Sequence, residues 1–403
     1  MTVNLVTGSV PRGSDYFGRE HLIDQIWQRL ATDNVLLLAP RRFGKTGAMF
    51  RLLDAPREPF RPLYMDVEHL ESPADFVIEL LAALRHDDHF ARTVNALWEE
   101  TKEVGRYLRG LTSRIDLGSL KVYLREQTDL AKNWRSYGDR AVRLLAREHP
   151  RLLLLVDEFP IMVHQIAQRD IEELTRFLRW FRAARIAPDT QTRFLIGGST
   201  NLVSALDAMG LVDTVNDFVV QQVEPFDTST AQCFVREALK PQGIELIEEV
   251  REHLVRVVGT PIPYLLSLLM TLLLDRYRKS GAPITVDTVQ EVFETELLGG
   301  ATPFFCHYYS RLQQYYPGHE ARQAKAILGV LSRSDSPVRK DTLYQIYLKC
   351  AALEHTASNT EQFQRLMQKL ENDFYVAGID DGYRFSNRAI QLWWKNNYGF
   401  QNA

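Results

Sequence analysis

The sequence has little of what marks a secreted or a membrane-embedded protein. Its three cysteines, Cys233, Cys306 and Cys350, are far apart and form no C-x-x-C pair. This excludes a disulfide framework and a cysteine zinc site, and it fits a reducing compartment. The longest apolar run, from Tyr264 to Leu274, has about half the length that spans a bilayer. The N-terminus lacks the basic-then-apolar pattern of a signal peptide. We therefore expect a cytoplasmic protein with no membrane partner.

An excess of charge of one sign is also missing. The 48 lysines and arginines nearly balance the 51 aspartates and glutamates, and the formal net charge is −3. This balance excludes a chain that coats nucleic acid over its whole surface, although one basic face would suffice for binding. Because 403 residues are too many for one hydrophobic core, we expect two or three globular domains.

Short apolar runs alternate with helix-like segments in the first half of the chain. Strands are expected at residues 34–38, 62–67, 152–156, 193–200 and 217–223. A short run that is apolar throughout is typical of a parallel strand covered on both faces. Strands that alternate with helices predict an α/β fold, with a doubly wound parallel sheet and helices on both faces.

The second half of the chain has helical patterns and ends in a hairpin. Three helix patterns are followed by two short apolar strands joined by Asp380-Asp381-Gly382, and an Asp-Gly turn in this position is a strong hairpin signal. Three helices and a hairpin are the order of a winged helix. We expect three domains: the sheet domain with a helical insertion at 86–135, an all-helical lid subdomain, and a winged-helix domain, with bounds 1–224, 225–320 and 321–403.

The segment Ala39–Thr46, APRRFGKT, lies between a predicted strand and a predicted helix. It matches the phosphate-loop pattern G-x-x-x-x-G-K-[ST], with alanine in place of the first glycine. Backbone N–H groups at a helix N-terminus bind phosphates, a lysine reaches the β and γ phosphates, and a hydroxyl binds Mg²⁺. An alanine with positive φ costs about 1–2 kcal/mol, whereas an alanine that ends the strand costs little. The predicted nucleotide-binding residues are Pro40, Arg41, Arg42, Phe43, Gly44, Lys45, Thr46 and Gly47.

Polar residues end the next two predicted core strands. Asp157 and Glu158 follow the apolar run LLLLV, where an aspartate can bind Mg²⁺ and a glutamate can polarise an attacking water. Together with the phosphate loop, the pair predicts a nucleotide site in which Thr46 and Asp157 hold the metal and Lys45, Asp157 and Glu158 are catalytic. Ser199 ends the following strand and is predicted to sense the γ-phosphate, although a helix N-cap is an equally simple role.

These motifs resemble those of a known group of ATPases. YFGREHLIDQI, residues 16–26, is similar to the box that opens the archaeal-type ATPases of the STAND and MNS branches of the AAA+-like NTPases. The phosphate loop, LLLLVDEFP, GGSTN, Gly259-Thr260-Pro261 and a C-terminal winged helix follow in the same order. The resemblance covers nearly the whole chain and is weakest over 86–135.

The resemblance implies a binding site for ATP and Mg²⁺ with contributions from outside the loop. It implies that Phe17, Gly18 and Arg19 shape the adenine and ribose pocket and that Pro261 touches the nucleotide from the lid. The chain departs from the family pattern at Ala39, and it has no clear sensor arginine beside Pro261 and no identifiable arginine finger. These departures are compatible with slow turnover. Three arginines are candidates for a phosphate contact from the same or a neighbouring subunit, or else ordinary solvated residues of a helix or loop: Arg182, Arg185 and Arg193.

Three functions agree with the sequence. The first is an ATP-binding and hydrolysing switch that couples nucleotide state to a protein partner, to nucleic acid or to a second copy of the chain. The second is an ATP-regulated DNA-binding protein of the initiator or transposition-accessory type. The third, suggested by Ala39, is a nucleotide-binding scaffold that does not hydrolyse. DNA would meet the winged helix at its basic residues, Arg339, Lys340, Lys349, Arg365 and Lys369, which alternatively form a solubilising or protein-docking face.

Overall fold

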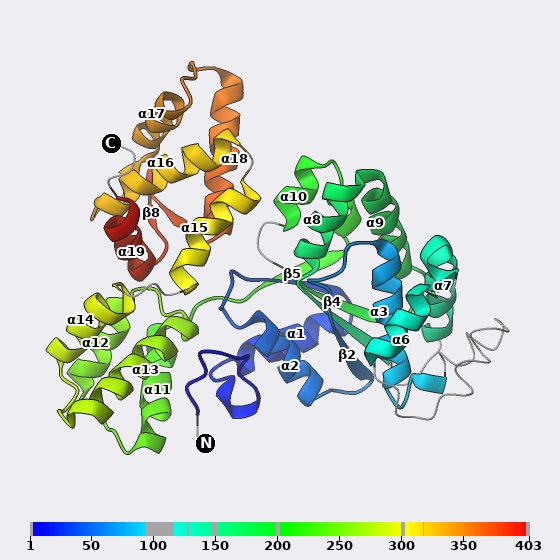
Figure 1. The fold of residues 1–403 in the computed structure, drawn as a ribbon, viewed down its shortest axis with the longest axis horizontal. Coiled ribbons are helices and arrows are strands. Elements are labelled where there is room, and N and C mark those ends of the chain that lie inside the picture. Colours follow the sequence, from blue (N-terminus) through cyan, green and yellow to red (C-terminus); the bar gives the residue numbers. More distant parts are fainter. Residues whose placement is uncertain are drawn as a thin grey trace. The chain divides into compact units, whose positions relative to one another are not determined.

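The computed structural model describes residues 3–92, 117–126, 129–146, 151–198, 202–299, 303–316 and 318–399 (Figure 1). The chain forms two compact units. One is Arg19–Val223, and the other combines Met1–Gly18 with Glu224–Ala403. The sequence placed residues 1–224 in one domain, whereas the contacts group the first eighteen residues with the C-terminal half. The three-domain division stays a prediction.

The first unit is built on a parallel sheet of five strands in the order β2-β3-β4-β1-β5. Its strands are β1 (Asn34–Leu38), β2 (Phe60–Asp66), β3 (Arg151–Asp157), β4 (Arg193–Gly198) and β5 (Phe218–Gln222). Neighbouring strands pair in parallel throughout. The predicted α/β fold with a parallel sheet is therefore confirmed, and the carboxyl ends of all five strands lie at one edge.

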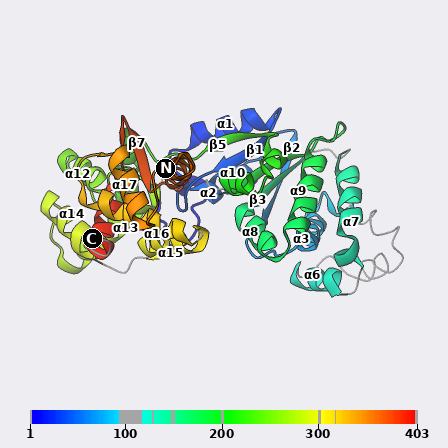
Figure 2. The same ribbon diagram turned by 90° about the horizontal axis from the view of Figure 1, so that it is seen from above.

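Helices cover both faces of this sheet, as Figure 2 shows for α1 on one side and α8 and α9 on the other. The helices of this unit are α1 (Glu20–Leu30), α2 (Lys45–Asp54), α3 (Pro73–His86), α6 (Leu117–Glu126), α7 (Leu130–Leu145), α8 (Phe159–Arg169), α9 (Ile171–Arg185) and α10 (Leu202–Ala208). Their ends follow local rules: the Ser72 hydroxyl accepts the N–H of Asp75 at 3.1 Å, and Pro73 occupies the first turn of α3, where its missing N–H costs nothing.

The described part of the predicted insertion packs onto the sheet domain. Leu120 and Leu124 of α6 are 5% and 1% exposed and belong to the same hydrophobic core as α3 and α9. Lys121 of α6 also forms an ion pair with Glu79 of α3, with 2.7 Å between Nζ and Oε2. Helix α6 is therefore a covering layer of the core.

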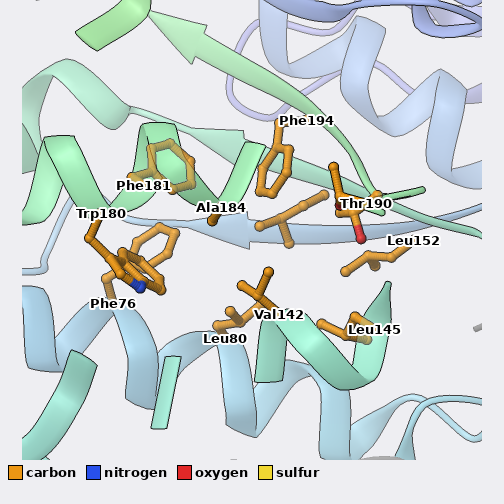
Figure 3. A pocket seen from close by; sticks show the side chains of 12 residues that line it. Phe76, Leu80, Val142, Leu145, Leu152, Trp180, Phe181, Ala184, Thr190 and Phe194 are labelled. Atoms are coloured by element: carbon orange, nitrogen blue, oxygen red, sulfur yellow. The ribbon is translucent and has the colours of Figure 1, made fainter. Parts of the chain in front are cut away.

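A small apolar cavity of about 20 Å³ lies in this core (Figure 3). It is lined by side chains from α3, α7, α9 and the sheet, among them Leu80, Val142, Leu152, Trp180 and Phe194. A space of this size holds about one water molecule, and a binding pocket for a small molecule is usually at least about 300 Å³. The cavity is therefore a packing gap.

The second unit contains a group of helices followed by helices with a small sheet. The first group is α11 (Thr228–Leu239), α12 (Glu248–Val258), α13 (Pro263–Ser280) and α14 (Val286–Val292). The remaining elements are α15 (Pro303–Tyr315), α16 (His319–Arg333), β6 (Val338–Arg339), α17 (Lys340–Cys350), α18 (Ala357–Asn372), β7 (Val376–Ile379), β8 (Gly382–Phe385) and α19 (Arg388–Tyr398). Strands β7 and β8 form the predicted antiparallel hairpin, and β6 joins it in the order β6-β8-β7.

Aromatic side chains join α15 to α19. The rings of Phe305 and Trp393 stack with 5.6 Å between their centroids, and those of Tyr309 and Tyr398 stack at 3.9 Å. Trp393 and Trp394 are 3% and 1% exposed, as expected for tryptophans that serve packing. Among the described helices, none combines the length and the hydropathy needed to cross a membrane.

Candidate functional site

The segment from Ala39 to Gly44 connects the carboxyl end of β1 to the first residue of α2. Positive φ angles occur at Arg42 (70°) and Gly44 (100°), whereas Ala39 does not have one. The Ala39 N–H donates to the carbonyl of Gly198 on β4 at 3.2 Å, so Ala39 continues the sheet ladder beyond β1. The departure from glycine at this position therefore carries no left-handed strain.

The loop is fixed from inside and open on the outside. The Phe43 side chain is 1% exposed and Pro40 is buried, while Arg41 and Arg42 are exposed. Helix α2 begins at Lys45, and the first N–H groups of a helix have no partner within the helix and carry a partial positive charge. A buried ring thus holds a loop whose backbone donors can face an anion.

Four side chains of the two sequence motifs meet at the edge where β1 and β3 end. The Thr46 hydroxyl donates to Asp157 Oδ2 at 2.6 Å. Lys45 Nζ lies 3.4 Å from Asp157 Oδ1 and 3.3 Å from Glu158 Oε1. Asp157 and Lys45 are nearly buried, with side chains 3% and 10% exposed, whereas that of Glu158 is 32% exposed. The structure therefore brings together a cation, a hydroxyl and two carboxylates, one of which is open to solvent.

The backbone is strained at both motifs. Five non-glycine residues in the described ranges have positive φ, and two of them are Arg42 in the loop and Glu158 (56°) directly after β3. A left-handed residue of this kind costs about 1–2 kcal/mol, and such strain clusters at functional sites, where the surrounding structure maintains it. At Glu158 the left-handed conformation ends the extended backbone of β3, and α8 begins at the next residue, Phe159.

Two further residues complete the surroundings of Asp157, and sequence reasoning missed both. The Tyr64 hydroxyl of β2 donates to Asp157 Oδ2 at 3.3 Å, and burial, followed by the charge of Asp157, raises the pKa of Tyr64 well above its usual value. Gly197 of β4 has no room for a side chain, because a Cβ there would lie 2.7 Å from Asp157 Oδ1 and would also collide with Met49. The double glycine at 197–198 was the only sequence signal for this contact.

Several predicted residues lie elsewhere or outside the described chain. Ser199 is outside the described residues. Phe17, Gly18 and Pro261 belong to the second unit: the Phe17 ring lies 5.7 Å from that of Phe234, and the Pro261 carbonyl accepts the N–H of Phe226 at 3.0 Å. Arg19 begins the first unit and precedes α1, and its backbone carbonyl accepts the N–H of Ile23 in the first turn of that helix. Their contacts with a nucleotide stay predictions.

The three candidate arginines do not reach the phosphate loop within one chain. Arg193 begins β4, and the other end of this six-residue strand borders the site, about 17 Å away at about 3.3 Å per residue. Arg185 is 3% exposed and forms an ion pair with Asp217 at 2.8 Å, before the first residue of β5. Arg182 bonds Asn216 in the same region. These arginines belong to the opposite edge of the sheet.

Comparison with known proteins identifies the fold of this chain. No protein-family model and no curated protein matches the chain. The solved structure of the Walker-type ATPase PABY2304 of Pyrococcus abyssi is similar with a TM-score of 0.63 at 15% identity, over 96% of this chain and 99% of that one. The Aeropyrum pernix ORC2 protein, solved as ADPNP–ADP complexes, is similar with a TM-score of 0.52 at 12% identity, over 96% and 95% of the two chains. The chain therefore has the P-loop NTPase fold, like these two proteins and as its sequence motifs predicted.

Proposed function

We propose that the protein is an ATP-binding and ATP-hydrolysing switch, in which nucleotide state at the loop is passed to a partner of the C-terminal unit. The observation that carries this proposal is the convergence of Lys45, Thr46, Asp157 and Glu158 within hydrogen-bonding or ion-pairing distance. P-loop enzymes that transfer phosphoryl groups bind the phosphates with a loop between a strand and a helix N-terminus. They hold the metal with an aspartate at the end of another strand.

The residues present fit Mg²⁺ bound together with a nucleotide. No group of three or more histidine, cysteine or acidic residues suited to a metal occurs in the described ranges, which argues against an all-protein metal cage. Mg²⁺ usually takes one or two protein oxygens and completes its shell with waters and phosphates. Thr46 and Asp157 would hold it, and it would supply neutralisation of the phosphate charge.

The side chains of the site have separate tasks in this proposal. The N–H groups at the start of α2 and the ammonium of Lys45 bind the phosphates. Lys45 is now the partner of Glu158 at 3.3 Å, and phosphate oxygens would replace that carboxylate as the partner of the ammonium. Glu158 is then free to accept a proton from the attacking water, which its 32% exposure allows to approach. ATP binding would thus activate the base.

A buried connection within the second unit supports the switch. Asn387 is 1% exposed, and its side-chain NH₂ group donates to the backbone carbonyls of Val258 and Thr260 at 3.1 and 2.9 Å. Its side-chain oxygen caps α19 by accepting the backbone N–H of Ile390. The segment Gly259-Thr260-Pro261, predicted to contact the nucleotide, is thereby bonded to the first turn of the last helix. A displacement at Pro261 would move α19 with it.

DNA is the less well supported partner of the predicted winged-helix domain. On α18, the Arg365 guanidinium is paired with Glu361 at 2.7 Å. Lys369 is 19% exposed and contacts Glu320 at 2.8 Å. The tip of the β7–β8 hairpin carries two exposed aspartates, Asp380 and Asp381. Phosphates are neutralised by lysines and arginines. Lys369 is held in a partly buried pair and the hairpin tip is acidic, so we favour a protein partner or a second copy of the chain, although Arg339, Lys340 and Lys349 stay exposed.

Calorimetric titration with magnesium–ATP tests the proposal. Lys45→Ala is expected to weaken binding about 10–100-fold, since a hydrogen bond to a charged group contributes about 1.5–3 kcal/mol. Lys395→Ala, a change of an exposed lysine on α19, is expected to bind like the wild type. A parallel titration with magnesium–GTP tests the choice of ATP. Absence of heat with either nucleotide in the wild type would refute the proposed site.

Gly197→Ala should impair the same site without changing any of its side chains. The added methyl group would push against the Asp157 carboxylate, and changes to the surroundings of a metal ligand typically cost about 10–100-fold in metal affinity. We expect at least about a tenfold loss of magnesium–ATP affinity in the same titration. Gly8→Ala is the matched control, because a Cβ there meets nothing within 4 Å. Equal affinities in the two variants would mean that the site accommodates the methyl group without displacing Asp157.

A further inference from the structure

The pairing of β2 with β3 brings Tyr64 to the side of Asp157. Tyr64 lies opposite Leu155 and Asp66 lies opposite Asp157 in a parallel register. Side chains alternate between the two faces of a sheet, so Tyr64 and Asp157 project from the same face, on neighbouring strands and two positions apart. Phe50 of α2 covers this face, since its ring centroid lies 4.9 Å from that of Tyr64.

The Asp157 carboxylate is held at both of its oxygens. Oδ1 accepts the backbone N–H of Glu158 at 3.0 Å. Oδ2 accepts the hydroxyl of Thr46 at 2.6 Å and that of Tyr64 at 3.3 Å. A hydroxyl that binds a cation through its oxygen keeps its hydrogen to donate, so Thr46 can remain bonded to Oδ2. Tyr64 is the second side-chain donor to that oxygen, and it is the one that does not itself bind the cation.

We infer that Tyr64 is a positioning residue: its hydroxyl holds the Asp157 carboxylate in the orientation that lets it share a divalent cation with Thr46. This inference rests on the proposed function. Hydrogen-bonding partners of metal ligands typically contribute about 10–100-fold to metal affinity or activity. The position of Tyr64 also suits the task, because its ring is fixed by α2, the helix that carries Lys45 and Thr46.

The test is the magnesium dependence of nucleotide binding in Tyr64→Phe, which removes the hydroxyl and keeps the ring against Phe50. ADP and a non-hydrolysable ATP analogue are titrated in EDTA and at a series of free Mg²⁺ concentrations. We expect nucleotide affinity in EDTA to stay within about twofold of the wild type. The Mg²⁺ concentration for half-maximal enhancement of binding should rise about 10–100-fold.

Tyr137→Phe is the matched control. Tyr137 belongs to the same unit, and its hydroxyl also donates to a carboxylate, that of Asp129 at 2.5 Å. This pair lies on α7 and at its N-terminus, and neither residue belongs to the proposed nucleotide site. If that variant shifts the Mg²⁺ dependence as much as Tyr64→Phe does, the effect is structural and the inference is wrong. An unchanged Mg²⁺ dependence in Tyr64→Phe also overturns it. If the wild type binds neither nucleotide, the proposed function fails and the inference fails with it.

Discussion

Glu158→Gln is expected to lower the rate of ATP hydrolysis by about 10²–10⁴-fold, the usual contribution of a general base, while magnesium–ATP affinity changes by no more than a few fold. Glutamine keeps the size of the side chain and meets the same left-handed backbone at φ 56°, so the fold should not change. The amide cannot accept a proton from water, and it also releases Lys45 from one of its two ion pairs.

Steady-state release of phosphate by the purified protein measures this effect. Glu71→Gln is the matched control, because Glu71 is a surface residue, 59% exposed, in an ion pair with Arg169. It should hydrolyse at the wild-type rate. Equal rates in Glu158→Gln and the wild type would remove the hydrolytic part of the proposal and favour the non-hydrolysing scaffold. Since Ala39 lacks a positive φ, the observation that first suggested such a scaffold no longer supports it.

The central strands and the convergence of Lys45 with Asp157 could be predicted because local sequence determines them. β1 and β3 are buried along their whole apolar lengths. The carboxyl ends of parallel strands lie at one edge of the sheet, so the residues that follow these ends gather there, even though β4 separates β1 from β3. The conformation of Ala39 could not be predicted, since an alanine is compatible with the end of a strand and with a strained loop.

The surroundings of Asp157 could not be predicted because they depend on strand order. Tyr64 reaches Asp157 only because β2 is the neighbour of β3, and Gly197 does so because β4 is the other neighbour. Sequence patterns determine which segments are strands and leave their order open. The position of Arg193 does not depend on strand order. This arginine begins its strand, whereas the site lies at the carboxyl ends of the strands, so its distance from the phosphate loop of its own chain follows from the strand direction.

The largest expected loss of stability is in the second unit, at the buried ion pair of Arg311 and Asp373. Arg311 Nη2 lies 3.1 Å from Asp373 Oδ1, with side chains 9% and 0% exposed. The Tyr316 hydroxyl donates to Oδ2 at 2.7 Å. Burial and the charge of Asp373 raise the pKa of Tyr316 well above its usual value, so this phenol remains a donor at physiological pH. The network joins the end of α15 to the residue that follows α18.

Asp373→Leu should destabilise this unit by about 3–5 kcal/mol, because it leaves the charge of Arg311 buried without its carboxylate. For a unit of this size that corresponds to a fall of about 6–20 °C in the midpoint of thermal unfolding. Glu361→Ala, which breaks the exposed pair with Arg365, should cost no more than about 1 kcal/mol. The double variant Arg311→Met/Asp373→Leu should recover most of the loss, since a buried pair replaced by apolar side chains is often neutral. If the double variant is as unstable as Asp373→Leu, the cost comes from lost packing and hydrogen bonding around Tyr316, and the unpaired charge is not its cause.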